Sequence, residues 1–223
     1  PLGGTWKTFT LRRPDQFRSA PPPAYNSAEF RASAQKLIDM KNNLTPEQAA
    51  IAKFWEGAEG TNLPAGIVND VYFPDIRAKV TEGDQARRWT VPRAVRAVAL
   101  LNIAMSDGGI AVWEDKYHYW YPRPVNGIRD SGIDRNWTPH LPTPFFPAYP
   151  SGSAGYAGGA EAVMSYLIPE KAAEFKRRAE EQALSRQYAG IHWDFDSVSL
   201  EGGRGVGALV VERARNDGAD RAA

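Results

Sequence analysis

Seventeen prolines and 20 glycines interrupt this chain of 223 residues, and their positions decide where helices can begin and end. A proline inside a helix removes a backbone hydrogen bond and clashes with the preceding turn, whereas a proline at the first helical position is tolerated. Between these interruptions apolar residues recur every three to four positions, and no stretch keeps the period of two that is typical of a β-strand. We therefore predict an all-α protein, built as a helical bundle.

Capping signals and apolar spacing predict the individual helices. Thr45–Gln48 supplies an N-cap, a proline at the first helical position and a glutamine that can close a capping box. The helix that follows should bury Phe54 and Trp55, and the longest helix should bury Val95 and Met105. A proline-rich segment, 125–150, is predicted to be a loop whose aromatic side chains form a folded wall. We predict helices over residues 27–42, 45–59, 67–80 with an interruption near Pro74, 92–121, 153–168, 170–188 and 203–215.

The proline content of residues 1–26 and the glycine content of Gly203–Gly207 indicate what these two segments form. Residues 1–26 carry Pro14 and Pro21–Pro23 among scattered aromatics and are predicted to form an arm or linker on the surface, so that 27–223 is a single all-α domain. Gly203–Gly207 superficially resembles a dinucleotide-binding loop. No strand precedes it, so we interpret these glycines as a place where helices pack closely.

The charge balance favours small partners. The chain has 27 basic and 26 acidic residues and a formal net charge of +1, which leaves no electrostatic footprint for nucleic acid. No apolar run approaches the length of a membrane span, and the first residues do not resemble a signal peptide. The chain does not begin with Met, so a segment is expected to precede it. The absence of cysteine excludes disulfides and thiolate sites. An exported location, periplasmic or secreted, is favoured over the cytoplasm, and apolar faces favour a homo-oligomer.

The segment Pro150–Ser153 joins the aromatic loop to a helix rich in small residues. Ser151 can cap this helix, and the backbone N–H groups of Gly152 and Ser153 then lack intrahelical partners. Such a helix start can bind an anion. Taken alone, the segment is more typical of a well-capped, tightly packed core helix.

Two further segments carry charged or nucleophilic side chains. Lys116 and Arg123 lie seven residues apart, about two helical turns, so both can reach one side. Arg186 lies on the face that its helix should bury, and His192 is followed four residues later by Asp196. Three cations, two N–H groups and a Ser hydroxyl suit a tetrahedral oxyanion, with the neutral ring nitrogen of His192 available to its central atom and Asp196 available to orient the ring. Each residue alone also fits a solvated face, a buried ion pair or a core histidine.

The order Lys-x6-Arg-Pro, Pro-Ser-Gly, then Ser-Arg-x5-His-x3-Asp resembles the signature of the vanadium-dependent haloperoxidase and type 2 phosphatidic acid phosphatase (PAP2) superfamily. The surrounding segments 121–130, 145–153 and 189–196 resemble the haloperoxidase branch. The likeness covers about residues 90–215 well and the segment Thr45–Gly60 more loosely. It implies the helical bundle of that superfamily, with a further segment on the N-terminal side.

The resemblance also implies roles for single residues. Lys116, Arg123 and Arg186, with the Ser151 hydroxyl and the Gly152 N–H, would bind vanadate or phosphate. His192 would bind vanadium in a peroxidase or become phosphorylated in a phosphatase. Ser153 stands where the superfamily has its acid–base histidine.

With serine at position 153 in place of that histidine, we expect the oxyanion site to persist and the turnover rate to fall. A serine hydroxyl exchanges no proton near neutral pH, and general acid–base help contributes ~10²–10⁴-fold. His118 and His140 are the two other histidines, and either could lie near the pocket as a substitute.

Three functions follow from the resemblance. The first is a haloperoxidase-like enzyme that uses hydrogen peroxide, halide and a small organic acceptor. The second is an acid phosphatase that cleaves a phosphomonoester through a phosphohistidine, and the third is a non-catalytic oxyanion-binding homologue.

Overall fold

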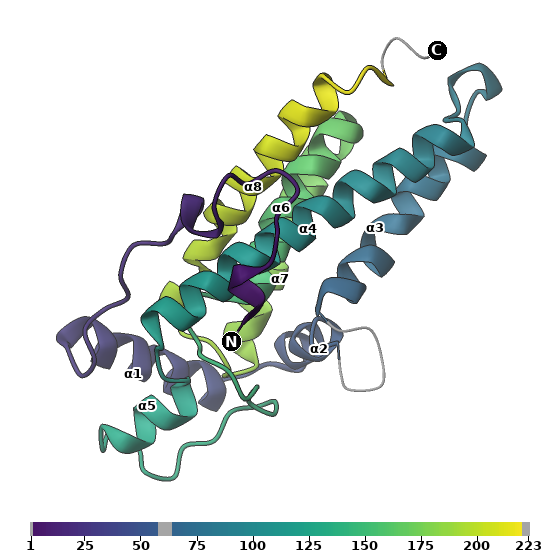
Figure 1. Cartoon of the computed structure of the whole chain (residues 1–223). Helices are drawn as coiled ribbons and strands as arrows, with labels where there is room; N and C mark the ends of the chain where they lie inside the picture. Colours follow the sequence, from purple (N-terminus) through teal and green to yellow (C-terminus); the bar gives the residue numbers. More distant parts are fainter. Residues whose placement is uncertain (1, 58–63, 220–223) are drawn as a thin grey trace.

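The computed structural model describes residues 2–57 and 64–219, and within them it confirms an all-α fold with no strand (Figure 1). The α-helices are α1 (Ala28–Asn42), α2 (Pro46–Phe54), α3 (Pro64–Thr81), α4 (Val91–Tyr119), α5 (Pro124–Asp130), α6 (Gly152–Leu167), α7 (Ala172–Tyr188) and α8 (Ser199–Arg215). Short 3-10 turns are η1 (Leu2–Thr5), η2 (Pro14–Phe17), η3 (Gln85–Arg87), η4 (Pro169–Lys171) and η5 (Asp194–Val198).

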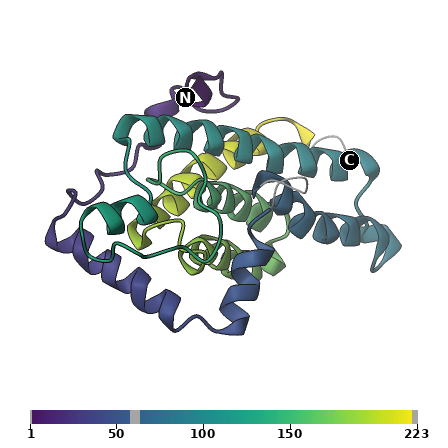
Figure 2. The same cartoon turned by 90° about the horizontal axis from the view of Figure 1, so that it is seen from below.

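Helix α6 lies at the centre of the bundle and packs against α4, α7 and α8. Helix α3 runs beside α4, while α1 and α5 lie together at one end of the bundle (Figures 1 and 2). The largest core cluster, which includes Tyr72, Leu101, Met164 and Phe175, fills the space between α3, α4, α6 and α7. This arrangement leaves the N-terminal end of α6 facing the loops at the α1 and α5 end.

The predicted caps at Thr45 and Ser151 are present, and Ser27 caps α1 in the same way. Ser27, Thr45 and Ser151 each accept a hydrogen bond from a backbone N–H in the first turn of the helix that follows. At α2 the capping box is complete, because the Thr45 N–H also donates to Gln48 Oε1 at 3.0 Å. Local sequence chemistry therefore determined where these helices begin.

Several predicted helix ends and faces were wrong. Helix α2 ends at Phe54, not near Glu59, and Phe54 is 54% exposed, while Trp55 is buried. The last predicted residues of that helix lie outside the described residues. Val95 is 62% exposed on α4, although Met105 is buried as expected. Apolar spacing alone could not distinguish the face of α4 that the other helices cover.

Prolines were also less disruptive than predicted. Pro124 does not merely stop the preceding helix: it occupies the first turn of a new helix, α5, inside the segment predicted to be a loop. Helix α3 continues through Pro74. Tyr72 and Ile76, on either side of Pro74, are buried in the core, and their packing holds the two halves together.

The N-terminal arm lies along α4 (Figures 1 and 2). The carboxylate of Asp107, which is fully buried, accepts hydrogen bonds from the backbone N–H groups of Phe9 and Thr10 at 2.8 and 2.7 Å. Further along, Asp115 accepts one from the Ser19 N–H at 2.9 Å. The division of the chain at residue 26 stays a prediction, but the arm is hydrogen-bonded to the bundle at several places, Asp107 and Asp115 among them.

One stretch, Val91–Asp130, contains a window long and apolar enough to cross a membrane, with a mean hydropathy of 1.4. The expectation that no apolar run approaches the length of a membrane span was therefore wrong. In the bundle 61% of this window is buried, as is usual for the core helix of a soluble protein.

The glycines of α8 confirm the packing interpretation of Gly203–Gly207. A Cβ atom built on Gly203 would overlap the carbonyl oxygen of Gly155 in α6, and one built on Gly207 would lie 2.9 Å from the Gly159 carbonyl oxygen. Both obstacles are backbone atoms, which cannot turn aside. Helices α6 and α8 therefore approach each other through glycine surfaces.

We expect Gly203→Ala to lower the free energy of unfolding by about 1–3 kcal/mol, because the added methyl group pushes two backbones apart. Gly202→Ala is the matched control: its Cβ would meet the Phe17 carbonyl oxygen at an ordinary 3.6 Å. This variant should be neutral or more stable by up to about 1 kcal/mol, since alanine favours helix. Urea unfolding of both variants measures the difference, and equal stability would contradict the close packing.

Candidate functional site

The proline-rich loop enters α6 at Ser151, and two hydrogen bonds fix this junction. The Ser151 hydroxyl accepts from the Ala154 N–H at 3.4 Å, and the Ser151 N–H donates to the backbone carbonyl of Asp196 at 2.8 Å. The Ser151 side chain is buried and acts as the cap. The start of α6 is thus attached directly to the segment that carries His192 and Asp196.

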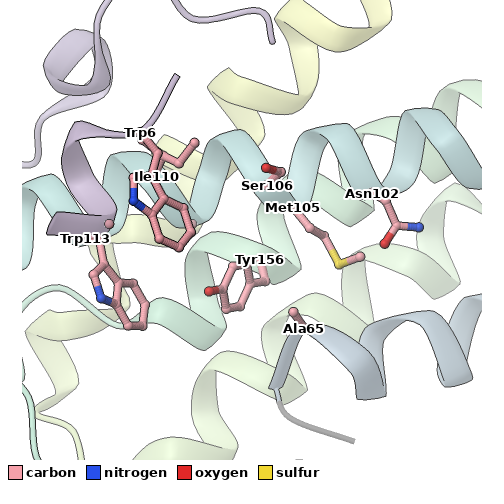
Figure 3. A pocket seen from close by; sticks show the side chains of 10 residues that line it. Trp6, Ala65, Asn102, Met105, Ser106, Ile110, Trp113 and Tyr156 are labelled. Atoms are coloured by element: carbon pink, nitrogen blue, oxygen red, sulfur yellow. The ribbon is translucent and has the colours of Figure 1, made fainter. Parts of the chain in front are cut away.

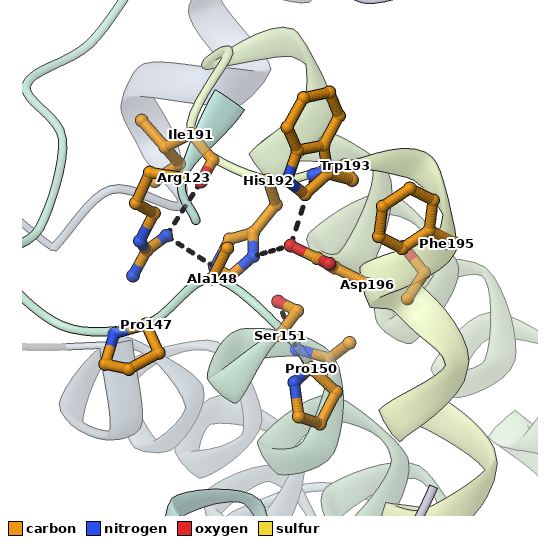
Figure 4. Close-up of polar contacts among 12 residues, drawn as sticks. Arg123, Pro147, Ala148, Pro150, Ser151, Ile191, His192, Trp193, Phe195 and Asp196 are labelled. Atoms are coloured by element: carbon orange, nitrogen blue, oxygen red, sulfur yellow. Dashed lines mark hydrogen bonds and ion pairs between the residues drawn. The ribbon is translucent and has the colours of Figure 1, made fainter. Parts of the chain in front are cut away.

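A cavity of about 100 Å³ lies in front of this junction. It brings together five of the predicted residues: Arg123, Gly152, Ser153, Arg186 and His192. Figure 4 shows Arg123 and His192 facing each other, with Asp196 behind the imidazole ring and Ser151 below it. The rest of the lining consists of Glu56, Trp113, Leu141, Pro142, Pro144, Phe146, Tyr156 and Ile191.

Arg123 is the N-cap residue of α5, and its guanidinium is buried. Nε donates to the Phe146 carbonyl at 2.8 Å, and Nη1 donates to the Ile191 carbonyl at 2.7 Å. The remaining nitrogen, Nη2, is buried without a hydrogen-bond partner. Burial lowers the pKa of Arg123 to about 10, so the group is still charged at neutral pH. A charged donor without an acceptor therefore remains on a residue that lines the cavity.

Arg186 projects from α7 on the buried face, as predicted. Its Nη2 donates to the Ala52 carbonyl at 2.7 Å, and its Nε donates to Ser185 Oγ at 3.0 Å. Burial lowers its pKa to about 10, and the charge of Glu56 opposes this shift. Glu56 itself pairs with Lys53 at 2.5 Å. Arg186 is thus held in place by neutral oxygens and remains a cation at the cavity.

Lys116 does not share a helix with Arg123, contrary to the expected spacing of two helical turns. Helix α4 ends at Tyr119, and Trp120 takes a left-handed conformation, φ 50°, that turns the chain away. The Lys116 Nζ atom donates to the carbonyl oxygens of Pro147, Ala148 and Pro150 at 2.6–2.9 Å. Burial lowers its pKa, but three acceptors require the three N–H donors of an ammonium group.

Lys116 and Ser151 therefore lie beside the cavity and are absent from its described lining. The Lys116 ammonium fixes the loop that forms the cavity wall and adds positive potential from behind. Direct contact of either residue with an anion stays a prediction.

His192 and Asp196 form the pair that the spacing predicted. Nδ1 of His192 lies 2.6 Å from Asp196 Oδ2, and Nε2 lies 3.1 Å from Arg123 Nη1. Since Arg123 can only donate, Nε2 must accept, and the ring proton is then on Nδ1. Burial and the Arg123 charge lower the pKa of His192 well below its usual value. The imidazole is neutral, with its lone pair on the nitrogen that faces the Arg123 guanidinium.

Asp196 is fully buried, and burial raises its pKa to about 7, whereas Lys116 and Arg123 oppose that shift. Its Oδ2 also accepts a hydrogen bond from the Trp193 N–H at 3.1 Å. Both donors to Oδ2 favour the carboxylate, so Asp196 orients the imidazole by accepting a hydrogen bond from Nδ1–H.

Ser153 lines the cavity, but neither candidate substitute for a histidine does so. His118 and His140 are both exposed and absent from the described lining. His118 stacks edge-on against Tyr119, and the backbone N–H of His140 donates to the Ala189 carbonyl. The expectation that one of them replaces the missing base receives no support from this geometry.

Sequence reasoning missed several lining residues, among them Glu56, Trp113 and Tyr156. Tyr156 follows Ser153 by three residues on α6, and helical spacing alone could have placed it on the same face. Glu56 lies just after the end of α2 and Trp113 lies on α4, so their proximity depends on tertiary packing that no local pattern reveals.

Charge balance distinguishes this site. Lys116, Arg123 and Arg186 are buried, and in the described ranges none of them forms an ion pair with a carboxylate within 4.0 Å. A buried charge is costly unless an opposite charge compensates it. No group of three His, Asp or Glu side chains that could hold a metal ion occurs among residues 2–57 and 64–219. The arrangement is therefore suited to a small anion with one nitrogen ligand.

Comparison with known proteins relates this chain to two groups of enzymes. Residues 96–174 match the family described as the VCPO second helical-bundle domain. The vanadium chloroperoxidase of Curvularia inaequalis is 35% identical over 188 residues, which cover 70% of this chain and 30% of that protein. The non-specific acid phosphatase of Salmonella typhi is 27% identical over 214 residues, 89% of this chain and 72% of that protein.

Solved structures give the same relationship. A bacterial vanadium-dependent iodoperoxidase superposes with a TM-score of 0.80 at 28% identity, covering 94% of this chain and 55% of that one. A transmembrane PAP2-type phosphatidylglycerolphosphate phosphatase from Bacillus subtilis, 16% identical, superposes with a TM-score of 0.54 and shares the fold. The chain thus spans only about half of the iodoperoxidase and less than a third of the chloroperoxidase.

We expect Asp196→Asn to move the His192 proton from Nδ1 to Nε2, because the amide nitrogen that can face Nδ1 donates where the carboxylate accepted. Long-range ¹H–¹⁵N NMR correlations of the imidazole ring measure this shift in the anion-free protein. Asp194→Asn is the control, since the Asp194 carboxylate accepts hydrogen bonds from Ser33 Oγ and Lys36 Nζ, whereas the ring is paired with Asp196. A native protein already protonated on Nε2 would contradict the assignment.

Proposed function

Since the chain belongs to the superfamily that unites vanadium haloperoxidases with PAP2-type phosphatases, we propose that its cavity binds vanadate and that the enzyme oxidises halide with hydrogen peroxide. The observation that carries this proposal is the set of buried cations that have no carboxylate partner in the described chain. An oxyanion with several negative oxygens would supply the missing charge.

The residues present fit vanadate. Arg123 Nη2 is a buried donor that lacks an acceptor, Arg186 provides a second guanidinium, and the Gly152 N–H lies at the start of α6. A side chain at position 152 would crowd the cavity, because its Cβ would lie 3.3 Å from the Trp113 ring. His192 offers one neutral nitrogen. When bound, vanadate supplies a Lewis-acidic centre that activates hydrogen peroxide for attack by halide.

The chain's own residues prepare this chemistry. Arg123 and Arg186 balance the charge of the anion, and their carbonyl contacts hold both guanidinium groups in place before it binds. Asp196 accepts a hydrogen bond from Nδ1–H, which keeps the ring proton on Nδ1 and leaves Nε2 unprotonated. Lys116 holds the three carbonyls of residues 147, 148 and 150, which fixes the loop behind the anion.

Ser153 limits the rate in this proposal. Halide oxidation by peroxide consumes a proton, and a serine hydroxyl cannot exchange one near neutral pH. The site should therefore bind its anion well and turn over slowly. Neither exposed histidine is close enough to line the cavity.

Phosphomonoester hydrolysis is the second candidate, and the similarity to an acid phosphatase along 89% of this chain favours it. Nε2 of His192 would attack phosphorus as the P–O bond to the leaving group breaks, and water would then cleave the phosphohistidine. Without an acid at position 153 the leaving oxygen must depart unprotonated. Aryl phosphates should thus be cleaved far better than alkyl phosphates. A third possibility is a binding protein without turnover.

An exported location and a homo-oligomer stay predictions. The further N-terminal segment that the resemblance implies is also still a prediction.

Vanadate binding and bromination of a small diketone test the proposal together. The native protein should bind vanadate, as measured by ⁵¹V NMR, and should brominate the diketone slowly. The His192→Ala variant should lose both vanadate binding and bromination. Ser153→His should raise the rate by ~10²–10⁴-fold if acid–base help is what the site lacks.

The outcomes separate the three functions. Hydrolysis of an aryl phosphate that depends on His192 but not on peroxide would favour the phosphatase. Binding of vanadate without turnover, even in Ser153→His, would favour a binding protein. A native protein that neither binds vanadate nor brominates would rule out the haloperoxidase function.

A further inference from the structure

A second cavity, of about 450 Å³, lies between α4, α6, the start of α3 and the N-terminal turn η1 (Figure 3). Its volume lies within the ~300–1,000 Å³ that is usual for small-molecule sites. The oxyanion cavity, at about 100 Å³, has no room for an organic molecule beside the anion. Of the two cavities, the larger one is therefore suited to an organic ligand.

The two cavities share part of their walls. Trp113 and Tyr156 line both of them. Trp113 also packs against Phe146, with ring centroids 5.2 Å apart, and Phe146 lies 4.9 Å from the Arg123 guanidinium. A ligand in the larger cavity would thus lie one aromatic side chain away from the oxyanion site.

Two glycines place these aromatic rings. A Cβ on Gly109 of α4 would lie 2.9 Å from the Tyr156 ring, and a Cβ on Gly3 would lie 2.8 Å from Trp113 Cδ1. Both distances are too short for a real side chain. Only glycine at these positions lets both rings lie against the backbone and leaves the space beside them open.

The lining determines what chemistry the cavity accepts. Apolar and aromatic groups dominate it, including Trp6, Met105 and Ile110 (Figure 3), and no charged side chain is among the described residues that line it. The Asn102 amide is already paired with Asn69 in both directions, at 2.9 and 3.0 Å. The hydroxyls of Ser106 and Tyr156 remain as polar contacts.

We propose that this cavity binds a neutral aromatic acceptor of one or two rings and holds it beside the oxyanion site for halogenation. The inference rests on the proposed haloperoxidase function. Peroxide and a proton oxidise halide by two electrons to hypohalous acid, with release of water. An aromatic carbon then forms a bond to the halogen as the O–halogen bond breaks, and the ring proton leaves with the oxygen as a second water.

Ser106→Phe tests the site by filling the cavity from an exposed position of α4. Ala99→Phe is the matched control, because Ala99 lies two turns earlier on the same face, is exposed and is not among the described lining residues. Ala65→Phe fills the same cavity from α3 and replaces Ser106→Phe if that variant fails to fold.

The probe is 6-fluoro-2-naphthol, whose binding ¹⁹F NMR measures with and without vanadate. We expect saturable binding to the native protein, at least about tenfold weaker binding to Ser106→Phe, and an equal rise in KM for naphthol bromination. In Ser106→Phe, the affinity for vanadate and the rate of diketone bromination should stay within about twofold of the native values, which corresponds to ~0.4 kcal/mol. Ala99→Phe should behave as native.

Absence of saturable naphthol binding, or equal binding to native protein and both cavity-filling variants, would overturn the proposal while leaving the haloperoxidase function intact. Failure of the native protein to bind vanadate would instead overturn the haloperoxidase function. The ¹⁹F measurement without vanadate would still decide whether the cavity binds an aromatic molecule.

Discussion

Buried positive charge at one end of the bundle connects distant segments of the chain and forms the candidate site. Lys116, Arg123 and Arg186 each donate hydrogen bonds to backbone carbonyls of a different part of the chain, and so connect α4 to the loop, α5 to the segment before His192, and α7 to α2. Carbonyl oxygens orient these cations without neutralising them. The positive charge that remains can therefore be neutralised by a bound anion. The surrounding backbone carbonyls cannot do this, because they carry no net charge.

The same arrangement explains the composition of the site. Asp196 is the carboxylate that contacts His192, and its position behind the ring means that it fixes a tautomer instead of pairing with a guanidinium. Ser153 adds a hydroxyl but no titrating group. In the proposed function, binding and proton transfer are thereby separated: the groups proposed to hold an oxyanion are present, while the group that would move a proton is missing. The larger aromatic cavity next to it is the proposed place of a second reactant.

Local chemistry made much of this predictable. The caps at Ser27, Thr45 and Ser151, the spacing of His192 and Asp196, and the close approach at Gly203 could be read from the chain, because each depends on neighbours in sequence or on the absence of a side chain. The direction of Lys116, the helix α5 and the lining residues Glu56 and Trp113 could not be predicted, since they depend on which distant segments meet.

A crystal structure of the protein soaked with vanadate tests the central claim most directly. The anion should lie in the 100 Å³ cavity, within hydrogen-bond distance of Arg123 Nη2 and Arg186, and its central atom should be bonded to Nε2 of His192. Vanadate bound elsewhere, or an empty cavity in which the Arg123 guanidinium has turned to a protein carboxylate, would contradict the assignment of this site to an oxyanion.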